Sequence, residues 1–153
     1  MNKILACTGF VLYALAVLSC AGSVAAKSSA GFDMVLGRDW ILEEFTSASV
    51  TTRIDRTKSG GIEIYSLRFE TQRLGGSGAP NRYSASYTTG EDKTISIGMV
   101  SSTRMAPIFE NENLREYDYF GCLQKVYRWD LRNGKLELYT KSETGNEAVL
   151  IFF

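Results

Sequence analysis

The feature that most constrains the fold is a strict alternation of side-chain types in the middle of the chain. In residues 81–89 two tyrosines and an alanine alternate with polar or charged residues, and residues 93–100 alternate again around two isoleucines. A period of two is typical of a β-strand with one buried face. Because residues 90–92, Gly-Glu-Asp, favour a turn, the sequence predicts an antiparallel hairpin here.

A second hairpin is predicted near the C-terminus. Two strand-like runs within residues 127–140 flank Asn133-Gly134. An Asn-Gly pair tolerates the positive φ angles of a type I′ turn, which is the strongest short-range signal for a hairpin. The last residues, 148–153, are apolar, and we expect them to form a strand that docks centrally and closes the sheet.

The remaining N-terminal half predicts two further strands separated by loops. Residues 38–45 and 62–70 are rich in strand formers, with a bulge expected near Tyr65 because the alternation changes phase there. The polar residues 46–61 and the glycine-rich residues 71–80 are interpreted as loops. The second loop lacks the lysine of a phosphate-binding loop, so its glycines indicate a turn or a close approach of backbones.

One helix interrupts this β-rich pattern. Pro107 cannot lie deep in a helix or a central strand, and Asn111 or Asn113 is a good N-cap for a helix that follows. Helical spacing places one apolar stripe on that helix, made of Tyr119, Phe120, Leu123, Val126 and Tyr127. We therefore predict a mostly β, α+β fold: about seven antiparallel strands in a curved sheet or incomplete β-barrel, with one amphipathic helix packed on it.

The N-terminus has the composition of an export signal. Lys3 precedes an uncharged, mostly apolar run of 15 residues, 4–18. A membrane-spanning helix needs about 20 such residues, so the run fits the core of a signal peptide better. Residues 20–33 are small and polar and indicate a flexible tether, which leaves residues 34–153 as the folded domain.

The end of this leader resembles the lipobox of bacterial lipoproteins. Val17, Leu18 and Ser19 precede Cys20, although the family usually has leucine where Val17 stands. The resemblance implies cleavage after residue 19, acylation of Cys20 and a membrane anchor of two or three fatty chains. The alternatives are ordinary cleavage after Ala26, which gives a secreted or periplasmic protein, and a retained helix.

The lipoprotein resemblance also bears on location and on the cysteines. Ala21 and Gly22 follow Cys20 without the aspartate that retains enteric lipoproteins in the inner membrane, so the outer membrane is the expected site in the cell envelope. With Cys20 acylated, Cys122 has no partner for an intramolecular disulfide. We expect Cys122 to be a small buried apolar residue.

Composition excludes several classes of function. The chain contains 17 basic and 17 acidic residues without a long basic cluster, so no nucleic-acid partner is expected. It contains no histidine, which excludes Ser-His-Asp and Cys-His catalysis and histidine-containing zinc sites. Carboxylate catalysis would need a converging pair, and the spacing of Glu43, Glu70, Asp118 and Asp130 indicates none. We expect no enzymatic activity, no cofactor and no metal.

The order of motifs from residue 37 to residue 153 resembles the META domain family, whose bacterial relatives include the HslJ-like heat-shock proteins. The segments that carry the resemblance are GRDWILEEF, GGSGAPNRYSASYTT, ISIGMVSSTRMA, EYDYFGCLQKV, GKLELYT and AVLIFF. The residues that match the family pattern and support its fold are Asn81, Tyr83, Tyr87, Thr103 and Met105. The family resemblance implies no catalytic site.

Two departures limit what the resemblance implies. The family has a cysteine before Asn81, where this chain has Ala79-Pro80, and another after Ala106, where it has Pro107. No function that depends on that pair of thiols is expected. The resemblance implies a β-rich half-barrel crossed by a helix, similar to lipidated pilot proteins of secretion systems. The expected function is a binding, chaperone-like or stress-related envelope module; the alternative is a lipocalin-like or pilot-like binder of an apolar ligand or partner peptide in the barrel cleft.

Overall fold

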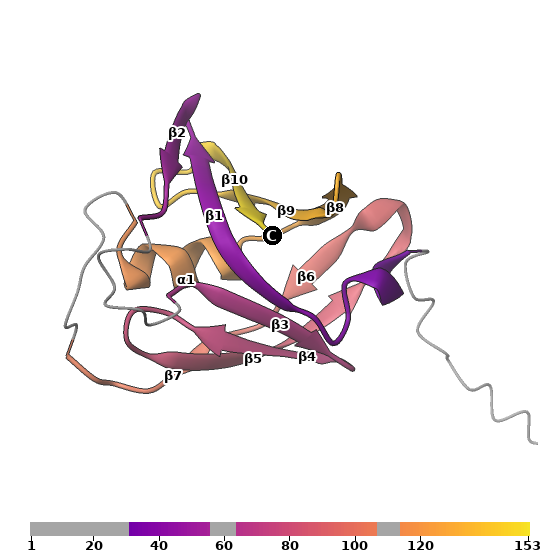
Figure 1. Ribbon diagram of the computed structural model, residues 1–153, viewed down its shortest axis with the longest axis horizontal. Helices are drawn as coiled ribbons and strands as arrows, with labels where there is room; N and C mark the ends of the chain where they lie inside the picture. Colours follow the sequence, from indigo (N-terminus) through magenta and orange to yellow (C-terminus); the bar gives the residue numbers. More distant parts are fainter. Residues whose placement is uncertain (1–30, 56–63, 107–113) are drawn as a thin grey trace, which may run out of the picture.

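The fold is a strongly curved antiparallel sheet with one helix, seen in a computed structural model that describes residues 31–55, 64–106 and 114–153 (Figure 1). The ten strands of these residues are β1 (Asp39–Ser47), β2 (Val50–Arg53), β3 (Ser66–Glu70), β4 (Arg73–Ser77), β5 (Arg82–Thr89), β6 (Ile95–Ile97), β7 (Ser101–Ser102), β8 (Arg128–Arg132), β9 (Lys135–Lys141) and β10 (Glu147–Phe152). The α-helix is α1 (Glu116–Gln124), and short 3-10 turns occupy Phe32–Met34 and Glu91–Lys93. No helix among these residues is both long and apolar enough to span a bilayer.

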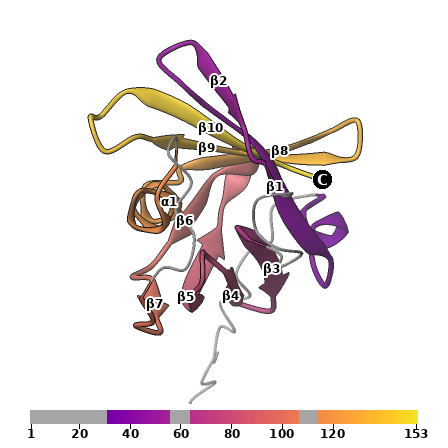
Figure 2. The same cartoon turned by 60° about the vertical axis from the view of Figure 1, so that its left-hand side comes forward.

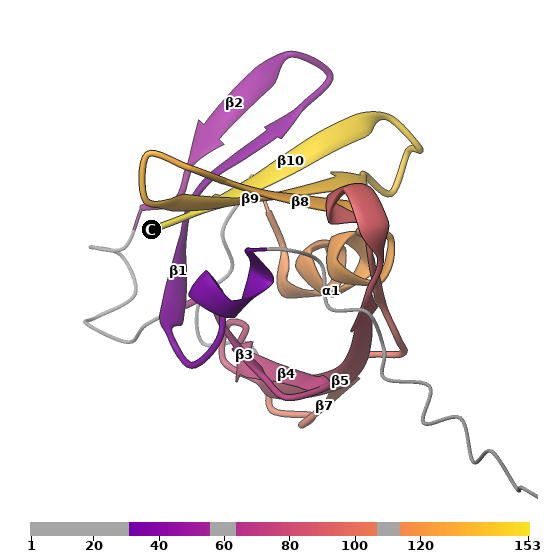
Figure 3. The ribbon, with the colours of Figure 1, turned by 90° about the vertical axis from the view of Figure 1, so that its right-hand side faces the viewer.

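The strands follow the order β6-β5-β4-β3-β1-β10-β9-β8, with β2 paired to β1 and β7 paired to β5. The two ends of this series approach each other, because Thr94 bridges to Arg128 and Ile95 N donates to Tyr127 O at 3.2 Å. The sheet is therefore a nearly closed barrel. Helix α1 lies between the β3–β5 half and the β8–β10 half (Figures 2 and 3). The expected fold class is confirmed.

Both predicted hairpins are present. Strands β5 and β6 are antiparallel neighbours, with Tyr87 opposite Ile97. Strands β8 and β9 flank Asn133 and Gly134, whose φ angles of 52° and 76° match a type I′ turn. The C-terminal strand β10 lies between β1 and β9 as predicted, so it is central in its half of the sheet.

Three strands lie where the sequence predicted none. The predicted loop 46–61 contains the end of β1 and the whole of β2, and the predicted loop 71–80 contains β4. Strand β7 has only two residues. None of these strands shows a full apolar alternation: β2 is an exposed edge, and β4 carries Gly75 and Gly76. A Cβ on Gly76 would meet the backbone oxygen of Ser66 at 1.9 Å, so the glycine allows the close backbone approach that was expected.

The helix is shorter than its predicted stripe. It begins at Glu116 with Arg115 as its N-cap, whereas the predicted caps Asn111 and Asn113 lie outside the described residues. It ends at Gln124, so the last two stripe residues lie beyond it; Val126 is buried there, but Tyr127 is 44% exposed and does not belong to the core. The side chain of Tyr127 instead donates a hydrogen bond to Glu147 on β10.

The space enclosed by the sheet and the helix is filled with side chains. The largest buried side chains are each at most 2% exposed: Trp40, Trp129, Tyr65, Tyr119, Phe69, Phe152, Leu42, Leu67, Leu74, Leu114, Leu123 and Leu136. Tyr65 has a φ of 53° and lies just before β3, and both it and its neighbour Ile64 are buried. The change of phase therefore marks a left-handed residue ahead of the strand, whereas the register shift between β1 and β10 lies at Leu42–Glu44. The interior is thus a packed core contributed by both halves of the sheet and by the helix.

Candidate functional site

A partly buried polar hub fixes the start of helix α1 against the loop before β5. Oε1 of Glu116 accepts hydrogen bonds from the backbone N of Ala79 at 2.6 Å and of Asn81 at 2.7 Å, and Oε2 accepts from Asn81 Nδ2 at 2.6 Å. Gly78 makes room for this carboxylate, because a Cβ there would lie 2.4 Å from Glu116 Oε1. No cation takes part in these three hydrogen bonds, since all three donors are uncharged amide N–H groups.

The opposite side of the Asn81 amide holds the segment after β7. Asn81 Oδ1 accepts from Thr103 Oγ1 at 2.9 Å and from Met105 N at 2.7 Å, while Nδ2 donates to Met105 O at 3.2 Å. Asn81 is only 5% exposed, and both its oxygen and its nitrogen are used. One amide therefore joins the loop before β5, the segment after β7 and, through Glu116, the helix.

The matching tyrosines also have structural partners. Tyr83 OH donates to Ser66 O at 2.8 Å and therefore accepts from Tyr119 OH, which lies 2.8 Å away. Tyr87 OH donates to Glu70 O at 2.8 Å. Burial raises the pKa of both Tyr83 and Tyr119 well above the ordinary value, so these hydroxyls stay protonated. Their arrangement ties α1 to the sheet and offers no proton for transfer near neutral pH.

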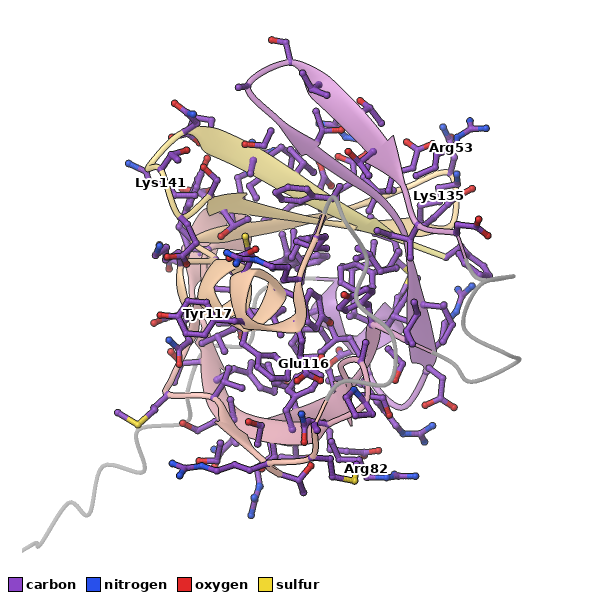
Figure 4. All side chains as sticks on the ribbon, turned by 90° about the vertical axis from the view of Figure 1, so that its left-hand side faces the viewer. Arg53, Arg82, Glu116, Tyr117, Lys135 and Lys141 are labelled. Carbon is purple, nitrogen blue, oxygen red and sulfur yellow. The ribbon has the colours of Figure 1, made fainter. Side chains whose placement is uncertain are left out.

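The outer side of this assembly is hollowed. A groove of about 370 Å³ runs between α1 and the segment that leads into β7. It is lined by Val100, Ser102, Tyr117, Phe120, Gly121, Gln124, Lys125 and Glu143. Tyr117 is 74% exposed and points away from the barrel (Figure 4), and Met99, beside Val100 in the chain, is 84% exposed. We call this hollow the α1–β7 groove.

Two further hollows lie elsewhere on the barrel. One, of about 280 Å³, is lined by Phe32, Leu36, Tyr87 and polar neighbours beside the first 3-10 turn. The other, of about 250 Å³, lies between the helix and the β9–β10 turn, where Asp118, Cys122 and Glu143 line it. Both are small compared with pockets that enclose a drug-sized ligand.

The four carboxylates considered for catalysis do not come together. Glu43 pairs with Lys135, Glu70 with Arg68 at 2.6 Å and Asp118 with Arg115 at 2.8 Å. Asp130 is surrounded by three cations, Lys93, Arg128 and Arg132. No two of these four carboxylates share a cationic partner, so these four residues do not form a converging pair with one another.

Asp130 is nevertheless electrostatically unusual. Its side chain is 7% exposed, Arg132 Nε donates to Oδ2 at 2.9 Å, and the backbone N of Leu131 donates to Oδ1 at 2.9 Å. The hydrogen bond from Lys93 is the largest cause that lowers the pKa of Asp130, to about 2. The carboxylate is charged at all physiological pH values and anchors Lys93, just before β6, to β8.

Cys122 is buried in α1, as predicted. It is 1% exposed and free, and burial raises the pKa of its thiol to about 12. A neutral thiol in a packed core is unreactive. Cys20, the predicted lipidation site, lies outside the described residues.

Sequence reasoning missed Glu116 as the centre of the hub. The available signal was its place as the first residue of EYDYFGCLQKV, one of the segments that carry the family resemblance. Asn81, Thr103 and Met105 were predicted to support the fold, and the hub gives each of them that role.

Comparisons with known proteins agree with this architecture. The META domain pattern matches residues 33–152. An NMR structure of a protein from Burkholderia xenovorans is similar, with 21% sequence identity, a TM-score of 0.59, and coverage of 81% of this chain and 87% of that one. The crystal structure of a DUF4847 family protein from Bacteroides vulgatus is 12% identical with a TM-score of 0.54, covering 79% of this chain and 94% of that one.

A search of curated proteins found no match. The two solved structures share the fold, and at these identities they support nothing more specific. The match to the family pattern spans almost the whole folded part and includes the hub residues. The chain therefore belongs to the META domain family.

Proposed function

We propose that this protein is a non-enzymatic lipoprotein of the bacterial cell envelope, whose META domain binds a partner through its outer surface. The observation that carries the proposal is the leader that ends in Val17, Leu18, Ser19 and Cys20. Acyl chains on Cys20 would hold the domain at the membrane, and two or three chains give lasting anchorage where one does not. Residues 21–30 would then separate the domain from the bilayer.

The packed interior supports binding on the outside of the barrel rather than within it. A lipocalin-like ligand would have to displace core residues such as Trp40, Trp129 and Tyr119, which are at most 2% exposed. The α1–β7 groove needs no such displacement, because Tyr117 is already exposed. The same groove suits the pilot-like alternative, a partner peptide, better than the barrel interior does.

Three observations support the proposal of a non-enzymatic role. No histidine is present in the sequence, and the four candidate carboxylates each have separate partners. The buried hydroxyls and the buried thiol are protonated at neutral pH. We therefore propose a binding or chaperone-like function.

Mass spectrometry of the protein purified from bacterial membranes tests the anchor. We expect the mature chain to begin at Cys20 and to carry the mass of a diacylglyceryl group, often with a third acyl chain. The Cys20→Ala variant should carry no acyl mass. A mature chain that begins at Lys27 without acyl groups would contradict the anchor and support ordinary secretion after Ala26.

Fractionation of inner and outer membranes then tests the location. Because no aspartate follows Cys20, we expect the acylated protein in the outer membrane. An Ala21→Asp variant should shift it toward the inner membrane in an enteric host. Equal distribution of both proteins would contradict the outer-membrane assignment.

A further inference from the structure

We propose that the α1–β7 groove binds an extended peptide segment of another envelope protein, which adds as a strand to the free edge of β7. This inference rests on the proposed function as a binding module and names its surface and its class of partner. Peptides that bind between a sheet edge and a helix use backbone hydrogen bonds for affinity and alternate side chains for specificity. The groove offers both kinds of contact.

The backbone of residues 100–104 directs hydrogen-bonding groups toward the groove. Met105 N and Thr103 N donate toward the β5 side, the latter to Arg82 O at 3.0 Å. Successive residues of a strand direct their amides to opposite sides, so the N–H groups of Val100 and Ser102 face away from β5. The N–H of Val100 confirms this direction, because it donates to Gln124 Oε1 on the helix at 2.9 Å.

Ser102 is the open position of this edge. Among the described residues β7 pairs with β5 alone, so no strand covers the side that Ser102 presents to the groove. Ser102 is exposed and lines the groove itself. An incoming strand could accept a hydrogen bond from its N–H and donate one to its C=O without breaking any bond within the barrel.

The opposite wall of the groove supplies apolar contacts. Phe120 packs partly against the core, with its ring 5.1 Å from that of Tyr83, and Tyr117 stands exposed beside it. Every second side chain of an extended peptide would face this wall. A lipid chain or another purely apolar ligand would instead leave the backbone groups of Ser102 without partners, which is costly when water is excluded.

Charged side chains line the groove or lie next to it in the chain. Lys125 and Glu143 pair at 3.2 Å at one end and leave no net charge there. Arg104, two residues beyond Ser102, is exposed and has no ion-pair partner among the residues that the structure describes. The fitting partner is thus an extended, alternately apolar segment with a carboxylate at the Arg104 end.

Phage display tests this assignment. A library of random eight-residue peptides is selected for binding to the mature protein purified from cells. We expect enriched peptides to alternate apolar residues and to carry Asp, Glu or a free carboxyl terminus. Their dissociation constants, measured by fluorescence polarisation, should rise about tenfold for Ser102→Pro, which removes the N–H that faces the peptide. Ser102→Ala is the matched control, because it loses the same side chain but keeps that N–H, and its affinity should be unchanged.

Proline is tolerated at edge positions whose N–H faces outward, so Ser102→Pro should fold, and its thermal unfolding is checked against that of Ser102→Ala. Tyr117→Ser should weaken binding by about fivefold or more. Equal affinity for Ser102→Pro and Ser102→Ala, or no peptide enriched above a Tyr117→Asp protein, would overturn the proposal. This result does not depend on acylation of Cys20, so the groove and the anchor can fail separately.

Discussion

Two carboxylates hold this barrel together in different ways. Glu116 accepts three hydrogen bonds from two backbone amides and one side-chain amide, with no cation among these donors. Asp130 is contacted by Lys93, Arg128 and Arg132. The first carboxylate joins the helix to the loop before β5, whereas the second joins Lys93 to strand β8 on the outer surface.

The comparison teaches which of the two sites governs the groove. Removal of Glu116 would leave several N–H groups without partners where the helix meets the sheet, and it would release Asn81, which also holds the segment after β7. Removal of Asp130 would leave three cations that are each at least 42% exposed and can be solvated by water. We therefore expect the larger structural cost at Glu116.

The largest effect is expected for Glu116→Ala. Loss of three short hydrogen bonds should lower the free energy of unfolding by about 3 kcal/mol, because unpaired donors near a core cost about 1–3 kcal/mol each and water can replace some of them. Urea unfolding at pH 7 measures the free energy of unfolding of the variant and of the wild type. Glu116→Gln, which keeps one carbonyl oxygen for the two backbone donors, should lose about half as much. A loss under about 1 kcal/mol for the alanine variant would show that the hub does not hold the helix.

Gly78→Ala should be the next most damaging change. Its Cβ would lie 2.4 Å from Glu116 Oε1, so the helix or the loop must shift, at a cost of about 2 kcal/mol. In the Glu116→Ala background that penalty should nearly disappear, because the obstructing atom is gone. Additive losses in the double variant would contradict the proposed clash.

Asp130→Asn should cost less and should depend on pH. The folded-state pKa of about 2 lies below the ordinary value of 3.8, so the charged group stabilises the fold above about pH 4 and loses that contribution as the pH falls toward 2. Because its partners are partly exposed, we expect about 1 kcal/mol at pH 7. The stability difference between wild type and Asp130→Asn should shrink between pH 4 and pH 2. A constant difference across that range would contradict the role of the charge.

The last prediction compares the two carboxylates through the rate at which Cys122 reacts with a thiol reagent. Cys122 lies within α1 with a thiol pKa raised to about 12, so the native protein should react with a thiol reagent only through opening of the structure. Glu116→Ala should speed this labelling by about tenfold or more at pH 8, whereas Asp130→Asn should leave the rate nearly unchanged. Equal acceleration by both variants would mean that the helix is not specifically held by Glu116.

Local patterns were sufficient to predict the two hairpins of this protein. The alternation in residues 81–97 and the Asn133-Gly134 turn predicted two hairpins, because a half-buried strand and a type I′ turn leave direct marks in the sequence. The phase change near Tyr65 coincides with a residue of positive φ just before β3 rather than with a bulge inside the strand. The resemblance to the META family rests on the order in which the motifs of these elements follow one another along the chain.

Tertiary contacts decided the rest. Strands β2, β4 and β7 are short or exposed or rich in glycine, so partners supplied by distant segments define them rather than their own side chains. Glu116 meets Ala79 and Asn81 across 37 and 35 residues of sequence, a distance over which no local pattern signals a contact. The groove likewise exists only where the helix ends up beside the free edge of β7. The sequence determined which segments become strands and helix with one buried face, and the packing of those faces decided which polar groups meet and which edge stays open.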